Sequence, residues 1–311
     1  MAPPLRTGFA LNFRTSSRDI DAVARVDEDV LDTIAYADRL GIDSVGVGQH
    51  HVVNTGGPFA SPLPFRVAAA ARTSRITLGT GVTTVPFEDP VLAEDAAFGL
   101  RPNHRHALCT EKVAALEGRP LSGGADGPPL YPPGTRVRGR WWQAATSLAG
   151  AAAAGAAGDG LQLDGFFDPA GTGQAPTVRA YLEVRHGLRP GEAPRVAVFR
   201  FVYPGRDKEP VLREVEPVLG PRLAAPAERA ARSANPALRG LSVREYLDLV
   251  PFHGSPDDIA ERVATDPAVA AEATDFVANF SYRDEVDVAN AHAHPHTLAT
   301  EIGWRPATAV R

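Results

Sequence analysis

The sequence between Leu40 and Ala97 alternates short apolar runs with helical patterns, and this alternation constrains the fold more than any other feature. Two apolar runs, Ser44–Gly48 and Thr77–Val85, each end in polar or glycine-rich sequence. Helical patterns cover Pro62–Ala71 between them and Pro90–Ala97 after them. Strands that alternate with helices in this way are typical of parallel βαβ units. This stretch therefore predicts an α/β fold with a parallel sheet.

The same alternation continues along the chain, so we expect one domain over residues 1–311. Further strands are expected at 6–13, 141–146, 158–163, 195–203 and 273–280, and further helices at 27–40, 105–117, 148–157, 174–186 and from Ser255 onward. A Gly/Pro-rich loop is expected at 118–139, and a helical excursion broken by prolines 210, 217, 221, 226 and 236 is expected at 207–250. No run between 98 and 135 has the pattern of a buried strand. The strands then number seven, one fewer than in a complete (β/α) barrel.

Composition excludes several classes of function. A net charge of −5 argues against a nucleic-acid partner, which requires a basic surface. The single cysteine, Cys109, excludes an intrachain disulfide and a four-cysteine metal site. Alternating histidines at 292, 294 and 296 have no acidic or cysteine partner nearby, so we expect a solvated tail and no metal site. No apolar run is long enough to cross a bilayer or to act as a signal peptide, which favours a cytoplasmic protein.

Three motifs in order carry a family resemblance. They are Gln49-His50-His51 after the second strand, Arg72–Val82 at the third strand, and the residues Asp89, Pro90, Ala93, Glu94 and Asp95 of the following helix. Together they resemble the bacterial luciferase-like flavin-dependent monooxygenases. The resemblance implies a TIM-type (β/α) barrel, here incomplete because the fourth strand and its loop have no counterpart. It covers residues 5–97 well and 105–280 more loosely.

The resemblance also implies site residues. His50 takes the position of a histidine that assists the oxygen chemistry of the flavin, and an imidazole that titrates near neutrality suits proton transfer. The alternative is that His50 only bonds to barrel backbone. Backbone at Gly79, Thr80 and Gly81 would approach the flavin ring, and a tight barrel layer is the alternative there. Cofactor-binding residues are also expected around the phosphate, at a helix N-terminus: Ala145, Thr146 and Ser147.

These residues suggest a two-component flavin-dependent monooxygenase. Reduced FMN would come from a separate NAD(P)H:flavin reductase and would bind weakly, because the absent fourth strand would have supplied a phosphate-binding arginine; a deazaflavin is the alternative cofactor. The substrate would be a small organic molecule, and a homodimer is implied by the family. Gln49 replaces the usual acid beside His50, and Gly46 stands where an aromatic residue is common. A degenerate or repurposed barrel that binds flavin weakly or not at all therefore stays open, as does a flavin-free enzyme with His50 as acid or base.

Overall fold

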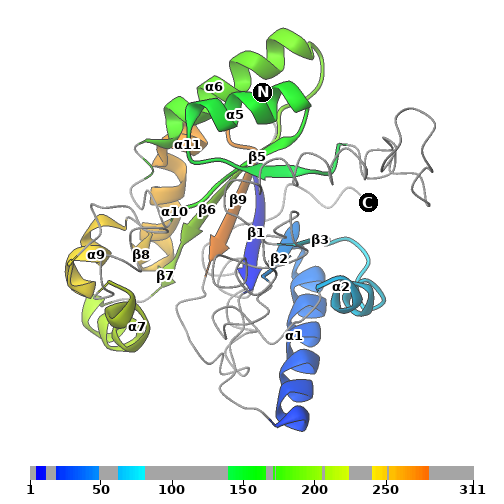
Figure 1. Cartoon of the computed structure of the whole chain (residues 1–311). Helices are drawn as coiled ribbons and strands as arrows, with labels where there is room; N and C mark the ends of the chain where they lie inside the picture. The colour runs from blue at the N-terminus through cyan, green and yellow to red at the C-terminus, as the bar shows by residue number, and fades with distance from the viewer. Residues whose placement is uncertain are drawn as a thin grey trace, which may run out of the picture.

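A parallel sheet of seven strands forms the centre of the computed structural model, which describes residues 5–11, 19–48, 62–80, 139–165, 171, 173–204, 207–223, 240–250 and 252–279. The strand order is β3-β2-β1-β9-β6-β5-β4, and every neighbouring pair is parallel. The bounds are β1 Arg6–Leu11, β2 Ser44–Val47, β3 Thr77–Thr80, β4 Trp142–Ala144, β5 Gly160–Leu163, β6 Val196–Phe201 and β9 Asp275–Asn279. The sheet curls into an incomplete (β/α) barrel (Figure 1). The expected seven-stranded incomplete barrel is confirmed.

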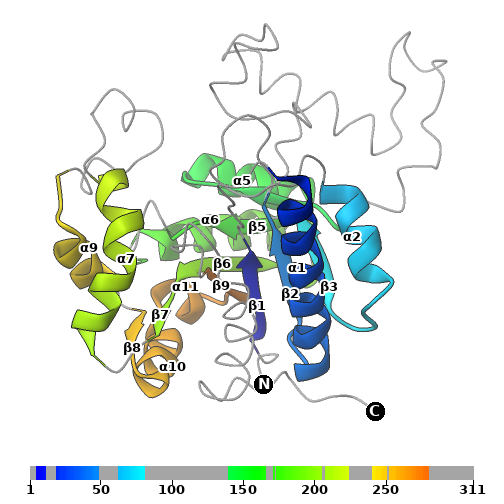
Figure 2. The same cartoon turned by 90° about the horizontal axis from the view of Figure 1, so that it is seen from below.

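Helices and one small strand pair surround this sheet (Figures 1 and 2). The helices are α1 Ile20–Leu40, α2 Pro62–Ala70, α5 Leu148–Ala157, α6 Gln174–Leu188, α7 Lys208–Leu223, α9 Val243–Leu249, α10 Pro256–Thr265 and α11 Pro267–Ala270. Strands β7 (Tyr203–Pro204) and β8 (His253–Gly254) form a separate parallel pair beside α7, α9 and α10. The sequence did not predict this pair, because strands of two residues leave no periodic pattern.

Side chains alternate between two faces of the sheet. Paired residues such as Phe9 and Val45 on β1 and β2, and Val198 and Phe276 on β6 and β9, are at most 1% exposed and belong to the core shared with the helices. Their immediate neighbours along each strand point to the opposite face, which we call the interior face. The core therefore lies between sheet and helices, as in a barrel whose interior opens at the carboxyl ends of its strands.

Capping residues set the helix ends. The first helix begins at Ile20, not at Asp27 as the apolar spacing predicts, because the Asp19 side chain accepts a hydrogen bond from Asp21 N at 3.1 Å and caps the helix there. It ends at Gly41, whose φ of 87° is the left-handed conformation that glycine adopts without strain. The result is a 21-residue helix that runs back along the first two strands.

Helix α7 corrects a second expectation. The prolines at 210, 217 and 221 were expected to break the excursion, yet α7 is continuous across all three. Pro210 lies in the first turn, where a backbone N–H has no intrahelical partner. Further on, the helix buries apolar side chains at helical spacing, namely Val211, Leu212, Val215, Leu219 and Leu223, and this burial favours the helix over a break at Pro217.

The two ends of the strand order are β3 and β4. The absence of the fourth strand predicts that these edges either pair directly or are covered by residues 98–140. Between described residues the direct pairing is not formed, since β3 pairs only with β2 and β4 only with β5. Nearly all of the covering segment, and of the 118–139 loop, lies outside the described residues, so that alternative stays a prediction.

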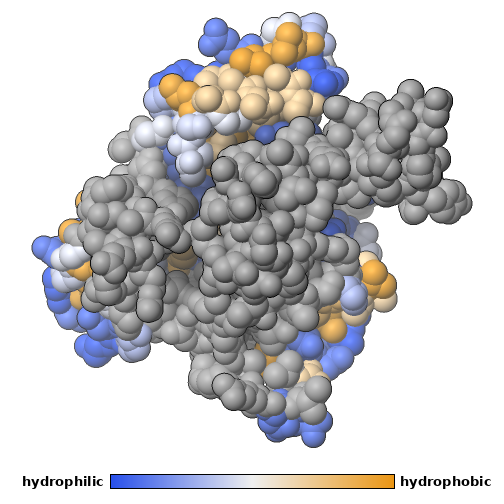
Figure 3. Space-filling model, viewed as in Figure 1, coloured by the Kyte–Doolittle hydropathy of each residue, from blue (hydrophilic) through white to orange (hydrophobic). Residues whose placement is uncertain are grey.

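Apolar side chains gather on the surface over α5 and α6 (Figure 3). Helix α5 carries no charged residue, and its Leu148 is 54% exposed. Leu188, at the end of α6, is 64% exposed. A further exposed apolar residue, Val67, lies on α2. Despite this, none of the helices in the described ranges has the length and hydropathy needed to cross a membrane.

Candidate active site

The sequence-predicted site residues that the structure describes all lie at the carboxyl ends of strands. Gly79 and Thr80 end β3, and Ala145–Ser147 follow β4. His50 and Gly81 fall outside the described residues, directly beyond the ends of β2 and β3 respectively, so their placement stays a prediction. In the strand order the two described groups lie at opposite edges of the curled sheet (Figure 1).

The end of β3 offers backbone with little side-chain cover. Gly79 pairs in register with Gly46 of β2, so neither strand places a side chain on the interior face at this level. Among the described residues, a Cβ added to Gly79 would meet Val45 O, at an ordinary 3.5 Å. From α2, Arg66 Nη2 donates to Leu78 O at 2.6 Å, and this bond fixes the strand beside its helix. The position is open enough for a flat ring to lie against the backbone.

The turn from β4 to α5 forms a helix N-terminus at the same end of the sheet. Ala145 N still donates to Gln162 O of β5 at 3.1 Å, and Ala145 is buried. Ser147 is the N-cap, and its Oγ accepts from Gly150 N at 3.2 Å. Thr146 and Ser147 are exposed. Free amide donors and the helix dipole make such an end suitable for an anion, and α5 has no acidic residue in its first turn to compete.

The interior face is divided into a small half and a large half. At the level nearest the carboxyl ends, the register aligns Gly79, Gly46, Ala10, Asn279 and Phe201 across β3, β2, β1, β9 and β6. One level below, it aligns Thr77, Ser44, Gly8, Val277 and Phe199. Strands β1–β3 thus carry nothing larger than threonine at these two levels. The larger side chains come from β6 and β9.

Sequence reasoning missed a polar and aromatic cluster on the large half. Asp164 directly follows β5 and is exposed, and its backbone oxygen accepts from Gln174 Nε2 at 2.8 Å. Tyr203, after β6, and Tyr246 of α9 are fully buried nearby. Burial raises the pKa of Tyr246 to about 12, the Tyr203 hydroxyl opposes this shift by hydrogen bonding, and the Asp164 charge adds to it. Only the position of Asp164 after an apolar run could have indicated it from sequence.

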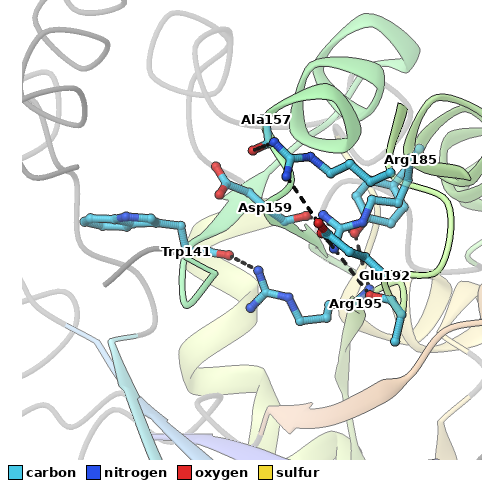
Figure 4. Close-up of polar contacts among 9 residues, drawn as sticks. Trp141, Ala157, Asp159, Arg185, Glu192 and Arg195 are labelled. Carbon is cyan, nitrogen blue, oxygen red and sulfur yellow. Dashed lines mark hydrogen bonds and ion pairs between the residues drawn. The ribbon is translucent and has the colours of Figure 1, made fainter. Parts of the chain in front are cut away.

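A second polar network lies at the opposite, amino-terminal ends of β4, β5 and β6 (Figure 4). Arg195 Nη2 donates to Trp141 O at 3.0 Å, and its guanidinium carbon lies 5.1 Å from the centre of the Trp142 ring. Arg185, only 4% exposed, donates to Glu192 Oε2 at 3.0 Å. The Tyr181 hydroxyl donates to Asp159 O at 2.9 Å. These contacts join strands to α6 at the end of the barrel that serves stability rather than chemistry.

No group of three or more His, Cys, Asp or Glu side chains that could hold a metal ion occurs within the described ranges. The histidines at 292, 294 and 296, and Cys109, lie outside these ranges. Within the described part of the chain, the carboxyl ends of the strands bring together backbone, hydroxyls, aromatic rings and the carboxylate of Asp164.

Residues 7–102 match the family model described as luciferase-like monooxygenase. These residues belong to the luciferase-like monooxygenase family. The luciferase-like segment is 42% identical over 79 residues to limonene 1,2-monooxygenase of Rhodococcus erythropolis. It is 37% identical over 70 residues to 4-hydroxyprotoasukamycin monooxygenase of Streptomyces nodosus subsp. asukaensis. The two alignments cover 25% and 22% of this chain and 19% of each relative.

Solved structures confirm the luciferase-like fold over nearly the whole chain. Monooxygenase RslO1 of Streptomyces bottropensis superposes with a TM-score of 0.73 at 20% identity, covering 96% of this chain and 98% of its own. The oxygenating constituent of 3,6-diketocamphane monooxygenase from Pseudomonas putida, in complex with FMN, gives 0.70 at 14% identity, with 97% and 98% covered. The coenzyme F420-dependent tetrahydromethanopterin reductase of Methanopyrus kandleri gives 0.59 at 14% identity, with 96% and 98% covered.

Proposed function

We propose that this protein is a flavin-dependent monooxygenase that oxidises a small organic substrate. The observation that supports this most is the geometry at the carboxyl ends of the strands. Gly79, with no side chain, and the N-terminus of α5 at Ser147, with no acidic residue in its first turn, both lie at the carboxyl ends of strands, and they are the proposed places of the cofactor's ring and phosphate. The luciferase-like segment and its monooxygenase relatives give the reaction class. In such a reaction one oxygen atom of O2 enters the substrate and the other leaves as water.

FMN is the proposed cofactor, and it supplies the electrons that activate oxygen when bound in reduced form. Thr146, the Ser147 hydroxyl and the first amides of α5 would hold its phosphate, and the backbone at Gly79–Gly81 would lie against its ring. No arginine is placed at this helix N-terminus by the described contacts, so the proposed FMN affinity is low. The F420-dependent neighbour supports a deazaflavin as the second candidate.

His50 is the proposed proton-transfer residue. It follows β2 in the sequence, and its position at the same end of the sheet as Gly79 is part of the proposal. An imidazole there can take or give a proton near neutral pH. Gln49 beside it has no charge to raise the basicity of the ring.

A two-component assay tests the proposal. The protein is supplied with FMN, NADH and a separate NAD(P)H:flavin reductase, and oxygen-dependent product is measured across a panel of terpenes, cyclic ketones and aryl-substituted amines. We expect His50→Gln to lower the rate by about 10²- to 10⁴-fold, the usual contribution of a general acid or base, with His51→Gln as the matched control. Product formation equal to the reductase control in the unmodified protein would reject the proposal.

The alternative is a barrel that has lost this chemistry. It is motivated by Gln49, by Gly46 and by the open order of strands that ends at β3 and β4. Titration of FMN fluorescence separates the two: quenching that saturates with protein supports the monooxygenase, and no change at high protein concentration supports the degenerate barrel. The reductase partner, the homodimer and a cytoplasmic location accompany the first proposal.

A further inference from the structure

The large half of the interior face carries a carboxylate beside aromatic rings, and the proposed function does not use either. Phe199 and Phe201 of β6 are half-buried on the interior face. The ring of Phe201 stacks on that of Tyr203, with centroids 6.5 Å apart and planes inclined by 16°. The rings therefore continue along one side of the interior from β6 into the segment that follows it.

Asp164 is held beside these rings by two contacts. Residues 161–163 of β5 pair with 196–198 of β6, so Asp164 lies one residue beyond the last pair, level with Phe199. Gly165 packs so closely on β6 that a Cβ there would come within 2.6 Å of Phe199 O. Gln174 of α6 is 6% exposed, and its side-chain amide donates a hydrogen bond to the backbone oxygen of Asp164. Together these contacts fix the backbone from which the Asp164 side chain projects.

Alternation along β5 directs the side chain of Asp164 to the interior face, opposite to the buried Leu161 and Leu163. The same charge adds to the raised pKa of Tyr246, whose ring is buried in the same region as that of Tyr203. Tyr203 is the residue on which Phe201 stacks, so carboxylate and rings share one region at the carboxyl end of β5 and β6. Asp164 itself stays exposed, so a ligand in the interior can reach it.

A carboxylate beside aromatic faces is the arrangement that recognises organic cations. The face of an aromatic ring attracts a cation electrostatically, and a carboxylate adds a charge-assisted hydrogen bond to an ammonium group. We propose that Asp164, with Phe199 and Phe201, forms the substrate side of the interior and selects a small molecule with an apolar body and a protonated amine. This inference deepens the proposed function and rests on it for the identity of the ligand as substrate. The flavin ring would occupy the small half, over β1–β3.

Binding of two near-isosteric probes tests the inference without flavin. Dissociation constants of benzylamine and benzyl alcohol are measured at pH 7 by ligand-observed NMR on the full chain. Asp164→Asn keeps the shape and removes the charge, and Glu183→Gln, on an exposed position of α6, is the matched control. We expect benzylamine to bind the unmodified protein about tenfold more tightly than the alcohol, since a charge-assisted bond contributes about that factor. In Asp164→Asn this preference is lost, and in Glu183→Gln it is kept.

A second variant tests the aromatic side. Phe201→Ala is expected to weaken both probes by at least threefold, because both have a ring to pack. Equal binding of amine and alcohol to the unmodified protein, or an unchanged preference in Asp164→Asn, would overturn the inference. The proposed function fails separately: an Asp164-dependent amine preference in a protein that gives no oxygen-dependent product would retain the cation site and reject the monooxygenase.

Discussion

Arg200 forms a buried ion pair in the second half of the barrel. It is 1% exposed, and its Nε and Nη2 donate to Asp266 Oδ2 and Oδ1 at 2.8 and 3.1 Å. Asp266 in turn accepts from Ala268 N and Val269 N and so caps α11. One buried ion pair thus connects β6 to the helices before β9. The sequence shows only an arginine in an apolar run, with no sign of its partner.

Removing one partner of this pair is expected to be costly. Arg200→Met should lower the free energy of unfolding by about 3–5 kcal/mol, because the Asp266 carboxylate stays buried without its cation. The matched control is Arg72→Met, which breaks an ion pair with Glu28 in which both side chains are at least 35% exposed. That change should cost about 1 kcal/mol or less. Urea unfolding measures both, and similar losses in the two variants would contradict the role of Arg200.

Ser147 is expected to act on both stability and cofactor binding. Ser147→Ala removes the cap of α5 and should cost about 0.5–2 kcal/mol in urea unfolding. Ser255→Ala removes the corresponding cap of α10, where Ser255 Oγ accepts from Asp258 N at 3.3 Å. Only Ser147→Ala should weaken FMN binding, and riboflavin, which has no phosphate, should be unaffected by either change. Equal effects of Ser147→Ala on FMN and riboflavin would argue against a phosphate at α5.

At the scale of elements, Asp38 joins α1 to the start of β3. Its carboxylate accepts from the backbone N–H groups of Ser74, Arg75 and Ile76 at 2.7–2.9 Å. Burial raises the pKa of Asp38, but the hydrogen bonds from Ser74, Ile76 and Arg75 outweigh burial and leave the pKa below its usual value. The ionised side chain therefore holds the turn that brings β3 alongside β2.

This lowered pKa predicts a pH dependence. The stabilisation is complete above the unfolded-state pKa of about 4 and is lost as the pH falls through the lower folded-state pKa. Asp38→Asn should destabilise by about 1–3 kcal/mol at pH 7, and its difference from the unmodified protein should shrink below about pH 4. Asp32→Asn, on the exposed face of α1, is the control and should show little change at either pH. A difference that stays constant between pH 7 and pH 3 would contradict this account.

Elements with a long apolar or capping pattern were predictable, and elements fixed by distant contacts were not. The seven strands of the sheet follow from buried runs such as those at β6 and β9, and α10 from Ser255 followed by proline and aspartates. The continuity of α7 depends on which of its side chains are buried, and this is a tertiary property. In the site, Ser147 could be predicted from its cap position. Asp164 could not, because Tyr203 and Tyr246, which give it a role, come from segments far along the chain.

At the scale of the whole molecule, the two halves of the curled sheet differ in the side chains that they place on the interior face. Strands β1–β3, with the luciferase-like segment, supply an open interior face, and β5, β6 and β9 supply large side chains and the carboxylate. The apolar surface then needs a separate explanation. Exposed patches of apolar side chains commonly mark interfaces between protein chains.

The luciferase-like resemblance implies a homodimer, and we predict that it forms through α2, which carries an exposed apolar side chain. Val67 is 72% exposed on α2, and a two-fold axis beside this helix would bury it against its own copy. Val67→Glu should therefore shift the protein from dimer to monomer in light scattering, because two like charges would meet at the axis. Leu188→Glu is the control, since Leu188 is 64% exposed on α6, well away from α2. A monomeric unmodified protein, or dissociation by Leu188→Glu alone, would place the interface elsewhere, and the apolar surface over α5 and α6 would then be the face that pairs.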